Sequence, residues 1–266
     1  MVGPALRITE PGGSPSTHLR QEVMGTVVTF DIFDDAGVAP EAVRRHLELA
    51  HSILRDADRV FSTWRATSPI SRLRRGELRL HEMPPSVRDV LASCMVARTL
   101  SGGWFDPWSM PGGIDPTGYV KGWATQRALD AIARSGVRSA MVNAAGDIAS
   151  IGGLRDGAPF RIGIADPSSP QVLACVVQLR GAIATSGTYE RGAHLVDPHT
   201  RRAATRVASG SVCGPDLGLA DALATALCVG GDEVLDRIEG IDDYEALTIG
   251  FDGAITTTTR FPVLGG

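Results

Sequence analysis

Between residues 139 and 185 the chain reads SAMVNAAGDIASIGGLRDGAPFRIGIADPSSPQVLACVVQLRGAIAT. Apolar and β-branched residues gather there into short runs, and Gly, Pro, Asp and Ser separate these runs. Runs of this length and composition predict strands at residues 139–143, 160–165, 172–179 and 182–185. This part of the chain therefore supplies a β-sheet.

Helical periodicity dominates the sequence on either side of this stretch. After Pro40, apolar residues from Val43 to Phe61 recur every three to four positions, with arginines and acids on the opposite face. A strand-like run at 26–33 precedes this helix. Near the C-terminus, residues 246–261 alternate and suit a strand, with Thr256–Thr259 at a β-edge. Helices are predicted at residues 40–61, 84–102, 121–134, 219–229 and 232–238.

Helices grouped early and strands grouped later favour an α+β fold over a doubly wound sheet. No internal repeat and no break in composition marks a second domain. We therefore expect one compact, two-lobed domain over residues 22–266, with a mixed or antiparallel sheet and flanking helices. Residues 1–21 are rich in Pro, Gly and Ser, and they predict a flexible N-terminal tail.

Composition and charge exclude several classes of protein. With 43% hydrophobic and 21% charged residues the chain is globular, and its net charge of −4 argues against a nucleic-acid partner. No window reaches the roughly 18 apolar residues of a membrane helix. Residues 1–21 contain no signal-peptide pattern, so a cytoplasmic location is expected. The four cysteines include no C-x-x-C pair, which argues against a zinc site or a redox dithiol.

Lys121 stands out because it is the only lysine among 26 Lys and Arg residues. A GC-rich coding bias explains why lysine is scarce, but not why this position keeps one. Lys121 follows a turn at Asp115-Pro116 that leads into a helix N-terminus, a place that favours anions. A phosphate or carboxylate bound there would account for the lysine, and a solvated lysine is the alternative.

Asp221 and Thr225 are four residues apart, so they share one face of the predicted helix. Their neighbours are small or apolar, which indicates that this face is buried. A buried carboxylate needs a partner, because desolvating its charge costs several kcal/mol. A hard divalent cation, Mg²⁺ first, would be such a partner. The alternative is that Asp221 caps the helix and that Thr225 bonds back to a carbonyl.

Other polar segments are less decisive. Asp106 precedes a proline, residues 143–147 read NAAGD after a strand, and Thr185-Ser186 end another strand before a glycine. Each pattern suits an ordinary turn as well as a contact with a ligand. His194 lies just before an apolar pair, and a lone histidine is more often packed or exposed than catalytic.

In their order along the chain, these segments resemble one family. The motifs are Met24-Gly25-Thr26, Phe61-Ser62-Thr63-Trp64-Arg65 with Ser68, Gly103-Trp104-Phe105-Asp106-Pro107, Asp115 with Lys121-Gly122, Asn143 with Gly146-Asp147, Thr185-Ser186-Gly187, His194 with Asp197-Pro198 and Thr200, and Asp221-Ala222-Leu223-Ala224-Thr225. Together they cover residues 24–230 and are similar to the ApbE-type flavin transferases, the FAD:protein FMN transferases.

This resemblance implies an α+β fold of two lobes around a central cleft, and a Mg²⁺-dependent reaction, with Mn²⁺ as the other candidate ion. FAD would be cleaved at its pyrophosphate, FMN would pass to a Thr or Ser hydroxyl of an acceptor protein, and AMP would leave. By similarity, His194 would be the general base, and the Gly118 carbonyl, Asp221 and Thr225 would hold the metal. The FAD site would be lined by Met24, Trp64, Trp104, Phe105, Asp106, Asp115, Lys121 and Val196.

Two alternatives stay open beside the transferase: an FAD pyrophosphatase that uses water as nucleophile, and a flavin-binding protein without catalysis. We expect a monomer or a homodimer. One position departs from the family pattern, because Arg201 stands where the family has a glycine after His-x-x-Asp-Pro-x-Thr. We therefore expect that turn to differ.

Overall fold

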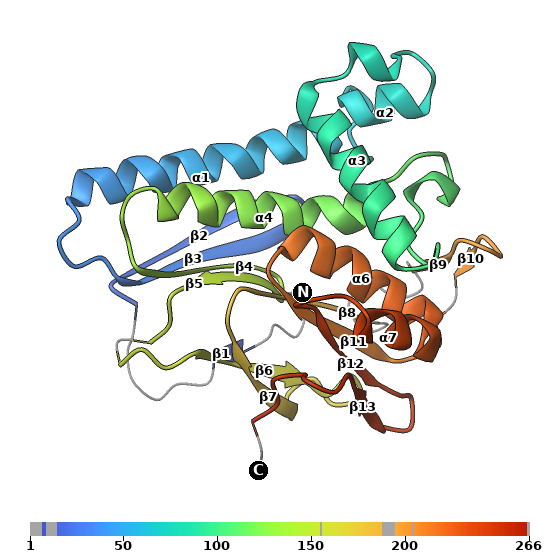
Figure 1. The fold of residues 1–266 in the computed structure, drawn as a ribbon. Coiled ribbons are helices and arrows are strands. Elements are labelled where there is room, and N and C mark those ends of the chain that lie inside the picture. The colour runs from blue at the N-terminus through green and yellow to red at the C-terminus, as the bar shows by residue number, and fades with distance from the viewer. Residues whose placement is uncertain (1–6, 9–14, 155, 188–194, 204, 265–266) are drawn as a thin grey trace.

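The computed structural model describes residues 7–8, 15–154, 156–187, 195–203 and 205–264. They form three layers: helices, an eight-stranded antiparallel sheet and a three-stranded antiparallel sheet (Figure 1). The predicted α+β class is confirmed. None of the described helices is long and apolar enough to cross a membrane.

The large sheet draws its strands from both ends of the chain. Its order is β13-β12-β11-β8-β5-β4-β3-β2, so β2 of the N-terminal hairpin forms one edge and β13 forms the other. The threonine-rich segment that contains β13 was expected to lie at an edge. The strands are β2 (Thr17–Val23), β3 (Thr26–Asp34), β4 (Ser139–Ala144), β5 (Asp147–Ile151), β8 (Ala182–Gly187), β11 (Ser209–Gly214), β12 (Glu245–Ile249) and β13 (Ile255–Thr257). The small sheet holds β1 (Arg7–Ile8), β6 (Phe160–Ala165) and β7 (Leu173–Leu179).

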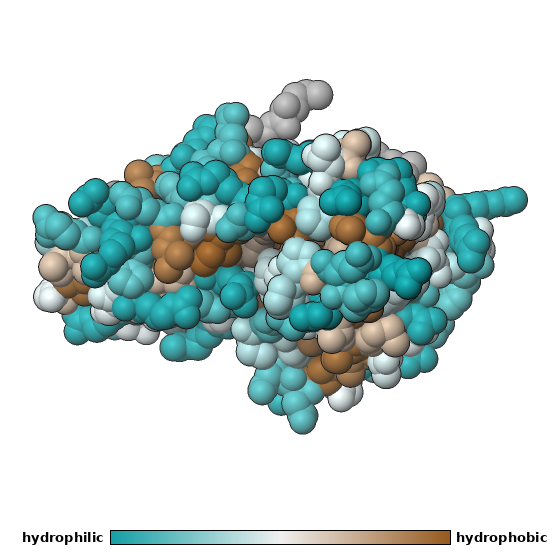
Figure 2. Space-filling view, turned by 90° about the horizontal axis from the view of Figure 1, so that it is seen from above, coloured by the Kyte–Doolittle hydropathy of each residue, from teal (hydrophilic) through white to brown (hydrophobic). Residues whose placement is uncertain are grey.

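The helices cover one face of the large sheet (Figure 1). They are α1 (Pro40–Phe61), α2 (Pro69–Arg74), α3 (Pro85–Leu100), α4 (Thr117–Ala133), α6 (Leu217–Gly230) and α7 (Asp232–Glu239), and β9 (Val196–Asp197) and β10 (Arg202–Ala203) form a small separate hairpin. A proline occupies the first turn of α1, α2 and α3, where its missing N–H costs nothing. Figure 2 shows the helix side, which is mostly hydrophilic with apolar side chains in separate patches.

Both faces of the central strands of the large sheet are buried. Phe30 and Val142 belong to a core shared with the helices, whereas Met141 and Ile183 belong to a second core shared with β6 and β7. Successive residues of one strand thus enter different cores. This explains why the central strands read as continuous apolar runs without a polar face.

The structure corrects three expectations about the elements. Residues 17–21, assigned to a flexible tail, belong to β2, which pairs with β3 along its whole length; its mostly exposed polar side chains hid the strand. β5 and β11 were not predicted. β11 reads SGSVCG and is buried throughout, because small residues allow α6 to pack closely on it: a Cβ on Gly210 would lie 3.1 Å from Leu227.

The third correction concerns α4, which begins at Thr117 rather than near Lys121. Asp115 Oδ1 accepts hydrogen bonds from the backbone N–H and the hydroxyl of Thr117, at 3.0 and 2.6 Å, and so stabilises the start of the helix. Lys121 therefore lies in the second turn, and Gly118 in the first.

Glycines bring α4 and α6 close together. A Cβ on Gly122 would overlap the backbone carbonyl of Leu217 and lie 3.0 Å from Asp221 Cβ. From the other helix, a Cβ on Gly218 would lie 2.9 Å from the ring of Tyr119. The two helices are thus closer than side chains at these positions would allow.

We predict that Gly122→Ala destabilises the protein by about 1–3 kcal/mol, because a packed backbone has to move to admit the methyl group. Urea unfolding of the variant measures this loss. Gly240→Ala is the control, since Gly240 has φ −91° and a Cβ there meets only an ordinary contact at 3.5 Å. Equal stability of the two variants would contradict the close approach of α4 and α6.

Candidate functional site

α6 is a core helix that carries two polar side chains, Asp221 and Thr225, on one face. Every residue of α6 is buried except Leu219 and Thr225, and Asp221 is only 3% exposed. Asp216, not Asp221, caps the helix by accepting a hydrogen bond from the Leu219 N–H at 2.8 Å. The alternative that Asp221 is a helix cap is therefore wrong. A carboxylate is instead placed inside an apolar helix, one turn before a hydroxyl with solvent access.

α4 contributes to the same place. The backbone N–H of Gly122 donates a hydrogen bond of 3.0 Å to Asp221 Oδ2. One turn earlier, a Cβ on Gly118 would lie 3.3 Å from the Phe105 ring and 3.4 Å from Thr225 Oγ1. The structure thus brings together four of the predicted site residues: Phe105, Gly118, Asp221 and Thr225.

The donor set at this junction suits a hard cation. It holds the Asp221 carboxylate and the Thr225 hydroxyl next to the backbone of Gly118, and carboxylate, hydroxyl and carbonyl oxygens are the ligands that such a cation takes. The described residues contain no group of three or more His, Cys, Asp or Glu side chains able to hold a metal. Mg²⁺ typically binds one or two carboxylates and takes its other ligands from water and substrate phosphates. The residues therefore fit Mg²⁺ better than zinc.

Lys121 points from α4 toward the sheet. Its Nζ lies 2.7 Å from Oδ2 of Asp147, the first residue of β5. The Asp147 side chain is fully buried, and the Lys121 side chain is 25% exposed. Asp147 was not among the predicted site residues, although the motif of Asn143 with Gly146-Asp147 had indicated its segment. Asn143, from the same motif, stabilises the turn by accepting a hydrogen bond from the Gly146 N–H at 2.8 Å.

Ser186 of β8 lies beside the junction of α4 and α6, and its neighbour Thr185 contacts β11. Ser186 Oγ lies 3.4 Å from Thr225 Oγ1, and Thr185 Oγ1 lies 2.8 Å from Ser211 Oγ. The N–H of Thr185 donates to Asp147 Oδ1 at 3.3 Å. A polar cluster of Thr225, Ser186, the Thr185 N–H and Asp147 therefore lies on the helix side of the sheet, whereas the hydroxyls of Thr185 and Ser211 pair on the side that faces β6 and β7.

The turn after α3 is held by its own polar groups. Asp106, which is 7% exposed, accepts hydrogen bonds from Trp108 N–H, Ser109 Oγ and Arg98 Nε at 2.9–3.0 Å. The Trp104 ring is also buried and packs against His199, with ring centroids 4.6 Å apart, and under the Arg206 guanidinium at 4.5 Å. His199 was not predicted as part of the site. Contacts of these residues with FAD stay predictions.

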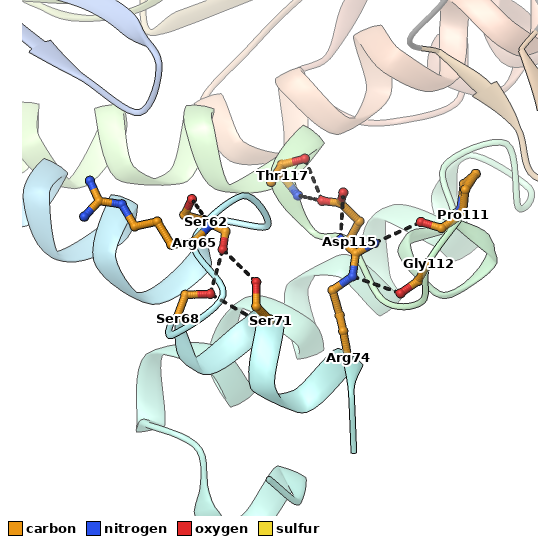
Figure 3. Close-up of polar contacts among 9 residues, drawn as sticks. All are labelled: Ser62, Arg65, Ser68, Ser71, Arg74, Pro111, Gly112, Asp115 and Thr117. Carbon is orange, nitrogen blue, oxygen red and sulfur yellow. Dashed lines mark hydrogen bonds and ion pairs between the residues drawn. The ribbon is translucent and has the colours of Figure 1, made fainter. Parts of the chain in front are cut away.

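Figure 3 shows the loop that holds Ser62, Arg65 and Ser68 and the segment that holds Asp115. Trp64 belongs to the first of these by its place in the sequence. The carbonyl of Ser62 accepts hydrogen bonds from the hydroxyls of Ser68 and Ser71, which fix the loop that carries Trp64. The Trp64 side chain is 93% exposed, so its ring is not part of the core.

Arg74 joins α2 to the loop before α4. Its guanidinium donates to the carbonyls of Pro111 and Gly112 at 2.9 and 3.0 Å and lies 3.4 Å from Asp115 Oδ2 (Figure 3). Asp115 is therefore engaged by α2 and by the start of α4 together. Its carboxylate positions the first turn of α4, which contains Gly118.

The remaining predicted residues lie around this cluster or outside the described part of the chain. Met24 occupies the β2–β3 turn with φ +54° and packs partly against the core. Val196 is half-buried in β9, which lies against α6. His194, the predicted general base, lies outside the described residues.

Asp197 organises the β9–β10 turn. Burial acts to raise the pKa of its carboxyl, but Oδ1 accepts hydrogen bonds from the N–H groups of His199 and Thr200, at 2.7 and 3.2 Å, and these hold the pKa below its usual value. A carboxyl of lowered pKa stabilises the fold above its unfolded pKa, and this contribution is lost as the pH falls through the folded value.

Known proteins resemble the part of the chain that contains these site residues. The sequence profile of the ApbE family matches residues 24–112 and 109–248. The chain belongs to the ApbE family. FAD:protein FMN transferases of Rhodobacter capsulatus and of Vibrio cholerae serotype O1 are 37% identical to it, over 155 and 131 residues. These stretches are 54% and 45% of this chain but only 29% and 39% of the two relatives.

Solved ApbE structures share the fold. Flavin transferase ApbE from Vibrio cholerae superposes with a TM-score of 0.77 at 22% identity, over 91% of this chain and 96% of that chain. The ApbE protein of Thermotoga maritima superposes with a TM-score of 0.81, also at 22% identity, over 92% and 97%.

Arg201, which stands where the family has a glycine, has φ +56°. This is the left-handed region that glycine adopts without strain. Arg201 therefore occupies a backbone conformation that favours glycine.

We predict that Arg201→Gly raises the free energy of unfolding by roughly 0.5–1 kcal/mol, because it relieves this strain. Arg202→Gly is the control: Arg202 is exposed like Arg201, but its φ is not positive, so glycine there lowers stability. Thermal unfolding of both variants shows whether the effects have opposite signs. A loss of stability in both would contradict the strain.

Proposed function

We propose that this ApbE-family chain transfers FMN from FAD to a Thr or Ser hydroxyl of an acceptor protein and releases AMP. The hydroxyl oxygen attacks the FMN-side phosphorus while the bond to the AMP oxygen breaks. His194 accepts the hydroxyl proton as general base. The partners are thus FAD and a protein that presents the hydroxyl.

The observation that supports this most is the α4–α6 junction. Asp221, Thr225 and the Gly118 carbonyl would hold Mg²⁺ there, with Mn²⁺ as the alternative ion. When bound, the ion neutralises charge on the pyrophosphate oxygens. Lys121, on the same helix as Gly118, supplies a positive charge that its pairing with Asp147 holds in place.

The aromatic residues suit a flat ligand. Trp64 exposes a ring that the core does not use, and Phe105 lies directly beside Gly118. Such rings stack on a flavin or an adenine. We assign Trp64 and Trp104, with Phe105, Asp106, Asp115, Met24 and Val196, to the FAD site.

Incubation with FAD, Mg²⁺ and a candidate acceptor tests the proposal. The expected products are AMP and an acceptor whose mass has increased by FMN. AMP and FMN without a labelled acceptor would point to the pyrophosphatase, and tight FAD binding without either product would point to a flavin-binding protein.

We predict that Asp221→Asn, which keeps the size of the side chain, abolishes AMP formation that depends on added Mg²⁺. The amide removes the only carboxylate of the proposed metal site. Asp216→Ala is the control on the same helix, since loss of this cap costs about 1 kcal/mol of stability but removes no proposed ligand. Unchanged turnover in Asp221→Asn would remove the metal assignment.

For His194→Ala we predict a fall in the rate of FMN transfer of about 10²-fold or more, with FAD affinity largely kept. Single-turnover kinetics and FAD fluorescence titration measure the two effects separately. A loss of affinity without a loss of rate would give His194 a binding role instead.

A further inference from the structure

Lys121 and Asp147 form an ion pair that the proposed reaction does not yet explain. In a chain that uses arginine at 25 of its 26 Lys and Arg positions, this pair uses the single lysine. A buried ion pair is weak evidence for stability, since the cost of desolvating both charges can exceed their attraction. The pair therefore calls for a role besides holding α4 on the sheet.

Asp147 is fixed from two sides. The Thr185 N–H of β8 donates to its Oδ1, and Lys121 Nζ lies 2.7 Å from its Oδ2. Asp147 itself is fully buried, so it is not placed to touch a ligand that enters from solvent. A quarter of the Lys121 side chain is exposed, so Lys121 can contact a ligand although Asp147 cannot.

The position of Lys121 matters because of its neighbour. Gly122, the next residue of α4, donates its N–H to Asp221, one of the proposed metal ligands. A lysine carries its charge on a flexible four-carbon stem. Without a fixed partner, this charge could move within the polar cluster.

We propose that Asp147 is a positioning residue: it holds the Lys121 ammonium beside the α4–α6 junction, where Lys121 binds a phosphate oxygen of the dinucleotide. This rests on the proposed function, since it assumes that FAD is the ligand. Asp147 acts on FAD only through Lys121. A merely structural ion pair would change the stability of the protein and leave FAD affinity unchanged.

A double-mutant cycle on FAD affinity tests this. Lys121→Met is expected to weaken FAD binding about 10- to 100-fold, the size of one charge-assisted hydrogen bond. Asp147→Asn is expected to weaken it by about tenfold, and the double variant to bind no worse than Lys121→Met within about twofold, because the effects are coupled. Full additivity, or an unchanged affinity in Asp147→Asn or Lys121→Met, would overturn the proposal.

Asp31→Asn is the matched control. Asp31 is 6% exposed, lies on β3 of the same sheet and pairs with His18 Nδ1 at 2.5 Å. Its loss removes a comparable buried carboxylate on the face of the sheet turned away from the helices, and FAD affinity is expected to stay within twofold of wild type. If Asp147→Asn does not fold, Asp147→Ser repeats the test with a hydroxyl that can still accept from Thr185.

The single lysine allows a second measurement that needs no flavin. Lys121 and the N-terminus carry the only amines that a small acetylating reagent can modify, and mass spectrometry of the peptides separates their stable amide products from each other and from modified Tyr, Cys or Ser. Lys121 is expected to react several-fold faster in Asp147→Asn than in wild type or Asp31→Asn; equal rates would overturn the proposal. If wild type does not bind FAD, the proposed function fails, and this rate still decides whether Asp147 holds Lys121.

Discussion

A carboxylate inside an apolar helix is the constraint on which this structure depends. Asp221 is buried in α6 among small and apolar residues, and a carboxylate in such surroundings is stable only with donors or a cation near it. The Gly122 N–H is one such donor, and it can reach Asp221 only because glycine allows α4 to lie against α6. The close approach of the helices and the polar site are thus one feature.

The sheet beneath α4 and α6 supplies the carboxylate that pairs with Lys121 and a hydroxyl that lies beside Thr225. β5 and β8 place the Asp147 carboxylate, the Ser186 hydroxyl and the backbone N–H of Thr185 under the two helices, while their other face packs against β6 and β7. Because both faces of the sheet are covered, polar side chains on the helix face cannot turn toward water. They bind one another, and the resulting rigidity suits a site that has to hold charged groups at fixed positions.

The sequence predicted much of this arrangement, for identifiable reasons. Strong periodicity placed α1 and α3, and apolar runs placed β6 and β7. β11 was missed because small residues give no strand signal, and β2 because its exposed side chains are polar. The motifs indicated Asp221 and Thr225, but their contacts with Gly122 and Gly118 depend on the crossing of two helices that are far apart in sequence. The motif also included Asp147, but its pairing with Lys121 could not be predicted, since only the fold brings the two residues together.

The pairing of β3 with β4 has a consequence for how the chain acquires its fold. Val28 lies opposite Ala144, so the N-terminal hairpin finds its neighbour only after more than 100 further residues. Until then, α1 also lacks α4, the helix against which it packs most closely. Contacts this distant close slowly because of the entropy of the intervening loop. During synthesis on the ribosome, the first half of the molecule therefore cannot complete its core before the central strands emerge. Until then its apolar side chains are exposed to aggregation.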